Sequence, residues 1–590
     1  MKMNPDGETQ SNRRLNAGCL LTGLPAIVLL LLAWHAGPNV VRHYSLLLAG
    51  PLLGISLGLL LIRLNALELS GPAGFSLPEC SFVAACGILL ALIAYWCGMR
   101  QFCGLDLSII IDIGWRLFNG QRLYVDFPCA FPIGFCLGAE AAFRLFGVYW
   151  RSIILFNSIW TCLLFLWLYA LLRCLFLNRL LSFWAAFTCV AITMVADSFW
   201  WYDPLTSMAG VLYAGSVAAV IIAPRHWGRW VSFCLSLLLL ALMKPNVAGV
   251  LIIGGTVCLF TFPVARWPAV IFSSLAFLLW LLVIHVHGST LPQVLGSYLS
   301  AGSMGLNFKA VLTGFGAVET HWFERLGGFI LLFGLCMPWL KRTRGAPASH
   351  PLAFLPYCCL VSGLYGFITD NDLKIVDMPL LLLGALFIAA RMQKDGPRLV
   401  VPSGWTGYLT FMCVLLTCVG LVEGVVRNRV KGNYLFFQYG INSEPFPVPF
   451  FQGMHGGPIL HSVVQDIATM MSTQDMSHVF FGNGLGWAYA AFDLQSPKGQ
   501  PSWWQRGISF PKAEETTYVD DWISRRYNPV LVMDVRYYDD QFRNAVGPLY
   551  TVGKEYDFER RWSAPLDILV PRDKARSSPP WRPNEVSVSD

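Results

Sequence analysis

Long apolar runs separated by short polar stretches fill the chain as far as about residue 425. A helix needs about 20 predominantly apolar residues to cross a membrane, and on that measure we expect about 13 transmembrane helices. The candidates are 18–36, 44–62, 81–98, 152–177, 181–197, 207–223, 229–244, 247–263, 268–286, 326–340, 352–369, 378–391 and 404–425. The pattern predicts a polytopic α-helical membrane protein.

One polar segment interrupts this pattern in the first third of the chain, GLDLSIIIDIGWRLFNGQRLYVDFPCAFP at 104–132. It follows the predicted span 81–98 directly. Its charged side chains are those of Asp106, Asp112, Arg116, Arg122 and Asp126. We therefore expect residues 99–151 to form a loop with helices lying on the membrane surface, where its carboxylates meet both lipid and water.

The apolar stretch 130–147 is the ambiguous element, because it carries Glu140 and Arg144 four residues apart. Charges are costly at bilayer depth but natural on the wet face of an interfacial helix. If 130–147 lies flat and the N-terminus is cytoplasmic, the later basic clusters all fall on the cytoplasmic side, as the positive-inside rule requires. If 130–147 spans the membrane, the later basic clusters all fall on the exoplasmic side. We therefore favour a helix that lies flat on the membrane surface.

This topology places several polar segments on one exoplasmic face. They are the loop 99–151, DSFWWYDP (197–204), 287–325, TDNDLKIVD (369–377) and the C-terminal tail. The basic clusters predicted on the other face are Arg13/Arg14, Arg63, Arg173/Arg179, Arg225/Arg229, Arg266, Lys341/Arg342/Arg344 and Arg391/Lys394/Arg398. We expect a multi-pass protein of the cell inner (plasma) membrane, with the C-terminal part periplasmic or extracellular.

The chain changes character near residue 427, where charges and Pro/Gly turns replace the apolar runs. HSVVQDIATMM has helical spacing, whereas HVFFGN and NPVLVMDV are typical of short buried strands. We divide the chain into a cytoplasmic tail (1–17), a transmembrane domain (18–426), a soluble α/β domain (427–571) and a disordered end (572–590).

Composition agrees with a membrane protein, since only 13% of the residues are charged, against about 25% in soluble domains. The net charge of +7 lies largely between the spans, so it reports topology and not nucleic-acid binding. There is no P-loop, GxSxG or HExxH motif, so nucleotide hydrolysis is not supported. Of the 17 cysteines, Cys103 and Cys129 flank the polar loop and are candidates for pairing if that side is oxidising.

Within and after the polar loop, an acid after an early span is followed by L-x-x-G-x-x-L-Y-x-D, a proline turn and a surface helix ending in F-G. This pattern resembles the GT-C superfamily of membrane glycosyltransferases, especially bacterial relatives of protein mannosyltransferases and of aminoarabinose–lipid A transferases. The chain departs from the family in having three predicted spans before the loop and Asp106-Leu107 in place of an acidic pair. The matching residues are Asp106, Leu117, Gly120, Leu123, Tyr124, Asp126, Pro132, Phe146 and Gly147.

The resemblance implies transfer of a sugar from a polyprenyl-phosphate-linked donor to an exoplasmic lipid, glycan or protein. An acceptor hydroxyl is a poor nucleophile, and a positioned carboxylate that takes its proton contributes about 10²–10⁴-fold. Asp106 is our candidate general base; the alternative is a charge that stabilises a helix N-terminus. Asp126 is the second catalytic candidate, orienting substrate or sharing a metal, or else it forms an Asx-turn. Asp112 and Arg116 have the spacing of a structural pair.

The leaving phosphate is anionic and needs cations around it. Arginines are one source and a divalent cation, Mg²⁺ or Mn²⁺, is another, although no metal ligands can be named. Lys244 interrupts an apolar stretch near the exoplasmic face, where it would meet the phosphate. The candidate substrate-binding residues are Arg122, Tyr124, Arg151, Trp201, Asp203 and Lys244. For Arg151 and Trp201 the alternatives are headgroup anchoring and an aromatic belt.

Two other functions are compatible with this topology. An O-antigen ligase-like or polymerase-like transferase would have its chemistry in the segment 287–325, with His321 and Arg325. A transporter would place ionisable residues in mid-membrane on paired broken helices, whereas here they gather at helix ends. We therefore rank the transporter last.

Overall fold

The computed structural model describes most of the chain between residues 75 and 504 and parts of its C-terminal region. The described residues are 75–100, 102, 104–196, 198–301, 354–369, 378–392, 398–430, 445–455, 458–473, 479–482, 484–504, 530–534, 544, 550–556 and 566–571. The predicted spans 18–36, 44–62 and 326–340 lie outside them, as does the predicted disordered end.

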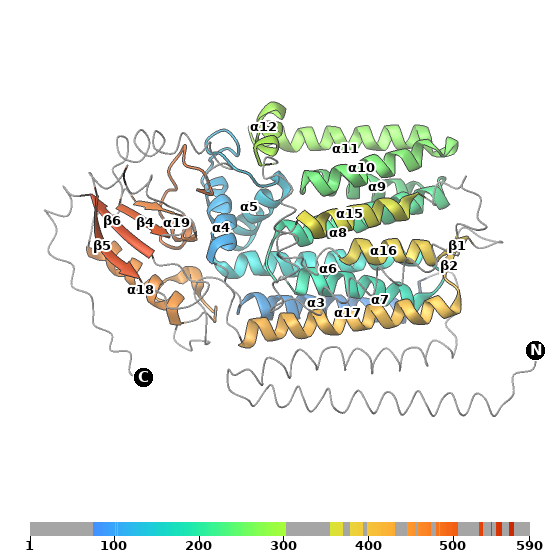
Figure 1. Cartoon of the computed structure of the whole chain (residues 1–590), viewed down its shortest axis with the longest axis horizontal. Coiled ribbons are helices and arrows are strands. Elements are labelled where there is room, and N and C mark those ends of the chain that lie inside the picture. Colours follow the sequence, from blue (N-terminus) through green and yellow to red (C-terminus); the bar gives the residue numbers. More distant parts are fainter. Residues whose placement is uncertain are drawn as a thin grey trace, which may run out of the picture.

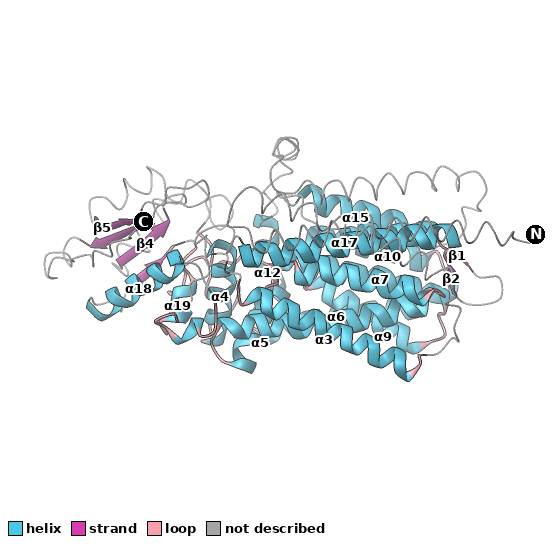
Figure 2. Cartoon of the chain, turned by 90° about the horizontal axis from the view of Figure 1, so that it is seen from below, coloured by secondary structure: helices cyan, strands magenta, loops and turns pink. Residues whose placement is uncertain are grey.

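Apolar helices run side by side through the larger part of the molecule (Figures 1 and 2). Each predicted span that falls on described residues coincides with one of these helices. Four are long and apolar enough to cross a membrane: Leu77–Gly98, Trp150–Leu175, Tyr202–Ile222 and Pro263–Val286. The bundle comprises α3 (Leu77–Gly98), α6 (Trp150–Leu175), α7 (Arg179–Val190), α8 (Tyr202–Ile222), α9 (Trp227–Ala241), α10 (Pro245–Phe260), α11 (Arg266–Val286), α15 (Leu355–Thr369), α16 (Met378–Ala389) and α17 (Ser403–Val430). These helices are those of a polytopic helical membrane protein.

The helices of the bundle differ strongly in how much of their surface is buried. The apolar window of α8 is 100% buried, whereas that of the helix ending at Val286 is only 17% buried. Small residues let neighbours approach α8 closely: a Cβ added at Gly210 would lie 2.8 Å from a methyl carbon of Leu251. The apolar side chains on α11, such as Trp267 (78% exposed), therefore form an outer surface suited to lipid.

The two ends of the helix bundle carry different polar groups. At one end Glu79, in the first turn of α3, accepts hydrogen bonds from Tyr169 Oη (2.6 Å) and Arg173 Nε (2.9 Å), and Arg179 Nη1 lies 3.6 Å away. The short strands β1 (Arg391–Met392) and β2 (Leu399–Val400) pair antiparallel at this end (Figure 1). The predicted exoplasmic segments that the structure describes lie at the other end, so the described basic clusters and the polar loop are separated as predicted. Which end faces the cytoplasm stays a prediction.

Two short helices, α4 (Gly104–Phe118) and α5 (Ile133–Phe146), lie at that second end, with α4 running across the bundle (Figure 1). They pack closely, because a Cβ at Gly114 would lie 2.9 Å from that of Ala139. With 14 residues, α5 is shorter than the roughly 20 needed to span a bilayer. This length agrees with the prediction that 130–147 does not cross. The helix α12 (Leu291–Ala301) lies at the same end.

The C-terminal region contains helices and a mixed sheet beyond α4 (Figures 1 and 2). The strands are β3 (Val479–Phe481), β4 (Val530–Asp534), β5 (Tyr550–Tyr556) and β6 (Leu566–Pro571), in the order β3-β4-β6-β5. Strands β3 and β4 are parallel, and the other neighbours are antiparallel. The helical elements are η5 (Pro449–Phe451), α18 (Pro458–Thr473) and α19 (Trp487–Ala491). The helix and both strands predicted here from the sequence are present; the domain boundaries stay predictions.

Candidate functional site

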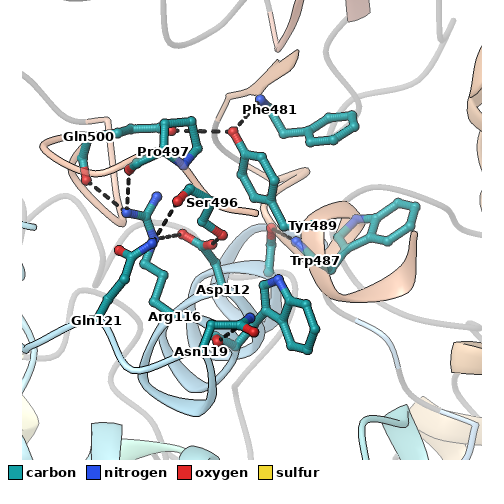
Figure 3. A network of polar contacts seen from close by, with 12 residues as sticks. Asp112, Arg116, Asn119, Gln121, Phe481, Trp487, Tyr489, Ser496, Pro497 and Gln500 are labelled. Carbon is teal, nitrogen blue, oxygen red and sulfur yellow. Dashed lines mark hydrogen bonds and ion pairs between the residues drawn. The ribbon is translucent and has the colours of Figure 1, made fainter. Parts of the chain in front are cut away.

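A buried ion pair on α4 joins the bundle to the C-terminal region (Figure 3). Arg116 Nε donates to Asp112 Oδ2 at 2.8 Å, and the two side chains are 0% and 3% exposed. Ser496 Oγ donates to Asp112 Oδ1 at 2.6 Å, while Arg116 Nη1 donates to the carbonyls of Pro497 (2.9 Å) and Gln500 (3.2 Å). The predicted pairing of Asp112 with Arg116 is confirmed.

Other side chains extend the same contact. Gln121 Nε2 donates to the Ser496 carbonyl at 2.6 Å, and Trp115 Nε1 donates to that of Leu494 at 2.7 Å. Tyr489 is 1% exposed and accepts from the Phe481 N–H at 2.9 Å. The aromatic residues Trp487, Tyr489 and Trp504 of the tail are all buried and therefore pack inside the protein.

Burial dominates the electrostatics of this contact. It raises the pKa of Asp112, which the Arg116 guanidinium and the Ser496 hydroxyl lower only in part. It also raises the pKa of Tyr489, to which the nearby Asp112 charge adds. A charge pair buried in this way holds two parts of the chain together.

Asp106 lies in the first turn of α4. Its side chain lies outside the described residues, so its role as a base stays a prediction. Phe102 and Trp150 stack edge to face with ring centroids 5.2 Å apart, which brings the start of α4 near the start of α6. Arg151 is exposed there, and its guanidinium carbon lies 4.6 Å from the centre of the Tyr149 ring.

Asp126 lies beyond the opposite end of α4. From Asp106 to Phe118 that helix rises roughly 18 Å. The Asp126 carboxylate accepts from the Arg122 N–H (2.8 Å) and lies 3.2 Å from Arg122 Nη2. Burial is the largest single influence and raises its pKa, but the Arg122 hydrogen bonds and the charges of Arg122 and Lys498 together outweigh it and lower the pKa overall. Asp126 and Arg122, both predicted to act on the substrate, are therefore paired with each other.

Tyr124 links this part of the loop to the turn before α5. Its φ of 62° is in the left-handed region, which a tyrosine rarely adopts. Its hydroxyl donates to the Phe131 carbonyl at 2.6 Å. The loop is also fixed from the other side, because Ser289 Oγ donates to the Leu123 carbonyl at 2.6 Å. The start of the predicted segment 287–325 thus packs on the polar loop, although His321 and Arg325 lie outside the described residues.

Lys244 and Asp203, both singled out from the sequence, form a salt bridge. Lys244 Nζ lies 3.0 Å from Asp203 Oδ1 and 5.3 Å from the centre of the Tyr202 ring. Their side chains are 19% and 5% exposed. Lys244 is also the N-cap of α10, and the N-terminus of a helix carries positive potential. This position combines a cation with a helix N-terminus at the polar end of the bundle.

Aromatic rings stand beside this pair. The Phe131 ring centroid is 6.1 Å from that of Trp201, 5.7 Å from Tyr202 and 5.8 Å from Trp503. We call Phe131, Trp201, Tyr202, Asp203 and Lys244 the Lys244 group. It unites three of the predicted substrate-binding residues, and Tyr124 joins it through the Phe131 carbonyl.

Arg151 does not join the Lys244 group. The Gly134 N–H at the start of α5 donates to the Leu242 carbonyl (2.9 Å), close to Lys244. Ser152 Oγ donates to the carbonyl of Phe146, at the end of α5 (3.1 Å). The two cations are thus separated by the length of α5, about 20 Å. The sequence identified them singly but held no signal for this separation.

No metal ligand set can be named from the described part of the chain, where no three His, Cys, Asp or Glu side chains gather. His287 Nδ1 lies 3.7 Å from Glu140 Oε2, and Arg144 Nε donates to Glu140 Oε1 at 2.7 Å. The pairing of Glu140 with Arg144 agrees with the predicted wet face of this helix. Asp197, Asp370, Asp372 and Asp377 lie outside the described residues.

Comparison with solved structures finds a likeness to ArnT from Cupriavidus metallidurans. For the crystal structure bound to undecaprenyl phosphate, the identity is 13% and the TM-score 0.45, covering 84% of this chain and 98% of that chain. For the apo state the identity is 13% and the TM-score 0.44, covering 85% and 100%. No protein-family model and no characterised protein sequence matches the chain. At this similarity, the function has to be argued from the chain's own residues.

Proposed function

We propose that the chain is a membrane glycosyltransferase that moves a sugar from a polyprenyl-phosphate-linked donor to an exoplasmic acceptor. The observation that carries this proposal is the Lys244 group. It combines a partly exposed ammonium, a helix N-terminus and aromatic rings at the polar end of an apolar bundle. The donor has the matching parts: an apolar chain, an anionic phosphate and a sugar.

Each part of the Lys244 group has a role in this reaction. The ammonium and the N-terminus of α10 stabilise negative charge on the phosphate as it leaves. The ring of Tyr202, which is partly exposed beside Lys244, is suited to stack on a sugar ring, and the buried Trp201 supports it from behind. Asp203 holds Lys244 in place until the phosphate arrives. The apolar faces of the surrounding helices accept the polyprenyl chain.

We assign the general base to Asp106. Its carboxylate takes the proton of the acceptor hydroxyl while that oxygen bonds to the anomeric carbon, and the carrier phosphate leaves with the electrons of the broken bond. The assignment rests on the sequence pattern, in which Asp106 follows an apolar span and lies in the first turn of α4. Asp126, paired with Arg122, takes a structural role in the loop.

The test of the phosphate site is a binding comparison on the purified full-length protein in detergent. Polyprenyl phosphate and the uncharged polyprenol are titrated against wild type, Lys244→Met and Arg144→Ala. We expect Lys244→Met to weaken polyprenyl phosphate binding by about 10–100-fold and to leave polyprenol unchanged. Arg144→Ala, which alters an exposed pair at the same end, should bind both lipids like wild type. Equal phosphate preference in all three proteins would contradict the proposal.

A further inference from the structure

Two cysteine thiols face each other in the turn that leads into α5. Cys129 precedes the N-cap Pro132, and Cys136 lies in the first turn of the helix. Their Sγ atoms are 3.8 Å apart, and the residues are 5% and 0% exposed. The pair lies at the α4 end of the molecule, on the side predicted to be exoplasmic.

The spacing is close to what a covalent bond requires. A disulfide places its sulfurs about 2.05 Å apart, so the two Sγ atoms have to approach by less than about 2 Å. Rotation of two short side chains supplies a movement of that size. The sequence suggested Cys103 as a partner for Cys129, but Cys103 lies outside the described residues.

We propose that Cys129 and Cys136 are joined by a disulfide in the mature protein, closing the loop 129–136. The oxidant is a protein or small-molecule disulfide of an oxidising compartment. The Cys129 thiolate attacks that disulfide and forms a mixed disulfide, releasing one thiol of the oxidant. The Cys136 thiolate then attacks Cys129 Sγ and releases the second. Two electrons pass to the oxidant, which takes up the two protons.

The environments of the two thiols agree with these roles. Burial acts to raise the pKa of Cys129, but hydrogen bonds with Cys136, Phe131 and Ser502 lower it below the ordinary value. The pKa of Cys136 is raised by burial and by the neighbouring Cys129. Since both are buried in the folded chain, the bond forms as the polypeptide folds.

The bond would fix one wall of the Lys244 group. Phe131 lies inside the closed loop, its carbonyl accepts the Tyr124 hydroxyl, and its ring contacts Trp201 and Tyr202. A covalent loop restricts the unfolded chain around that ring. The inference depends on the predicted sidedness of the membrane, and not on the chemistry proposed for Lys244.

A second thiol pair provides a matched control. Cys258 and Cys358 are hydrogen bonded to each other and buried, late in α10 and early in α15. Two residues after Cys258, the Phe260 carbonyl accepts a hydrogen bond from Arg266 Nε (2.7 Å), so this end of α10 lies beside one of the basic clusters. That end is predicted to face the reducing cytoplasm. We therefore expect Cys258 and Cys358 to remain thiols.

The experiment is thiol mapping of the full-length protein. Cells are treated with an alkylating reagent under denaturing conditions, and the protein is digested with trypsin and analysed by mass spectrometry. Cleavage after Arg122 and Arg144 releases a peptide with Cys129 and Cys136 as its only cysteines. We expect this peptide to be two hydrogens lighter than the dithiol and to take up alkyl groups only after reduction, while Cys258 and Cys358 are alkylated directly.

Direct alkylation of both Cys129 and Cys136, or a link from either of them to Cys103, would overturn the inference. A linked Cys258–Cys358 pair with free thiols at 129 and 136 would overturn it together with the predicted sidedness. As a second measurement, a reductant should lower the Tm of wild type by roughly 2–4 °C and leave Cys129→Ser/Cys136→Ser unchanged. An equal response of both proteins would count against the bond. Polyprenyl phosphate binding, measured separately, keeps failure here distinct from failure of the proposed function.

Discussion

Two oppositely charged pairs lie at the same end of the bundle and have different surroundings. Asp112 and Arg116 are buried at 3% and 0% exposure, and three groups from the tail form hydrogen bonds with them. Asp203 and Lys244 lie beside aromatic rings, with the lysine 19% exposed. The first pair is suited to hold elements together. The second retains a cation that an incoming anion can reach, and this difference separates scaffold from candidate site.

Breaking the buried pair should have the largest effect on stability. Arg116→Met leaves Asp112 buried without its cation, which costs about 3–5 kcal/mol in comparable buried pairs. We expect a large fall in the midpoint of thermal unfolding in detergent. Asp112→Asn/Arg116→Met should recover part of the loss because no charge stays unpaired. If Arg116→Met unfolds at the temperature of wild type, the pair is not a scaffold.

For the Asp203–Lys244 pair, removal of the acidic partner should strengthen binding of the lipid phosphate. Asp203→Asn removes a negative charge 3.0 Å from Lys244 Nζ, so the lysine no longer divides its attraction between Asp203 and the phosphate. We expect polyprenyl phosphate binding to tighten by roughly 3–10-fold, about 1 kcal/mol. Asp126→Asn, which alters the pair with Arg122, serves as the control. Weaker binding by Asp203→Asn would contradict the proposed competition.

The pH dependence of stability gives a further test, at the pair of Asp126 with Arg122. Its pKa is lower in the folded protein, so its stabilising contribution is present above its unfolded pKa of about 3.9 and is lost as pH falls through the folded value. Because Arg122 is 55% exposed, we expect only about 0–1 kcal/mol. The Tm difference between wild type and Asp126→Asn should therefore be small at pH 6 to 7 and close below about pH 4. A difference that grows on acidification would reverse the assigned sign.

The smallest effect is expected at the exposed pair of α5. Arg144 is 55% exposed and pairs with Glu140. Exposed pairs of this kind contribute about 0–1 kcal/mol, so Arg144→Ala should unfold within a few degrees of wild type. A loss as large as that of Arg116→Met would show that exposure does not distinguish these pairs.

The sequence predicted what depends on neighbouring residues. The apolar runs located α3, α6 and α8 because a span needs only a local run of apolar side chains. The spacing of four residues identified Asp112 with Arg116 for the same reason. The carbonyls and hydroxyl that form hydrogen bonds with this pair belong to residues 496–500, more than 380 positions along the chain, and no local pattern points to them.

The candidate site was predicted residue by residue but not as an arrangement. Asp203 and Lys244 were both identified as polar residues near the surface. Their salt bridge, however, joins residues 41 positions apart in the chain. Arg151 was placed with them, although α5 separates it from Lys244. Such arrangements are set by packing, which hydropathy and spacing do not record.

The most direct test of the central claim is sugar transfer by wild type and Asp106→Asn reconstituted in proteoliposomes with glycosylated polyprenyl phosphate from a lipid extract. We expect wild type to consume the lipid-linked sugar and Asp106→Asn to do so about 10²–10⁴-fold more slowly at an unchanged Tm. Transfer at the wild-type rate by Asp106→Asn, or no consumption of lipid-linked sugar by either protein, would contradict the account.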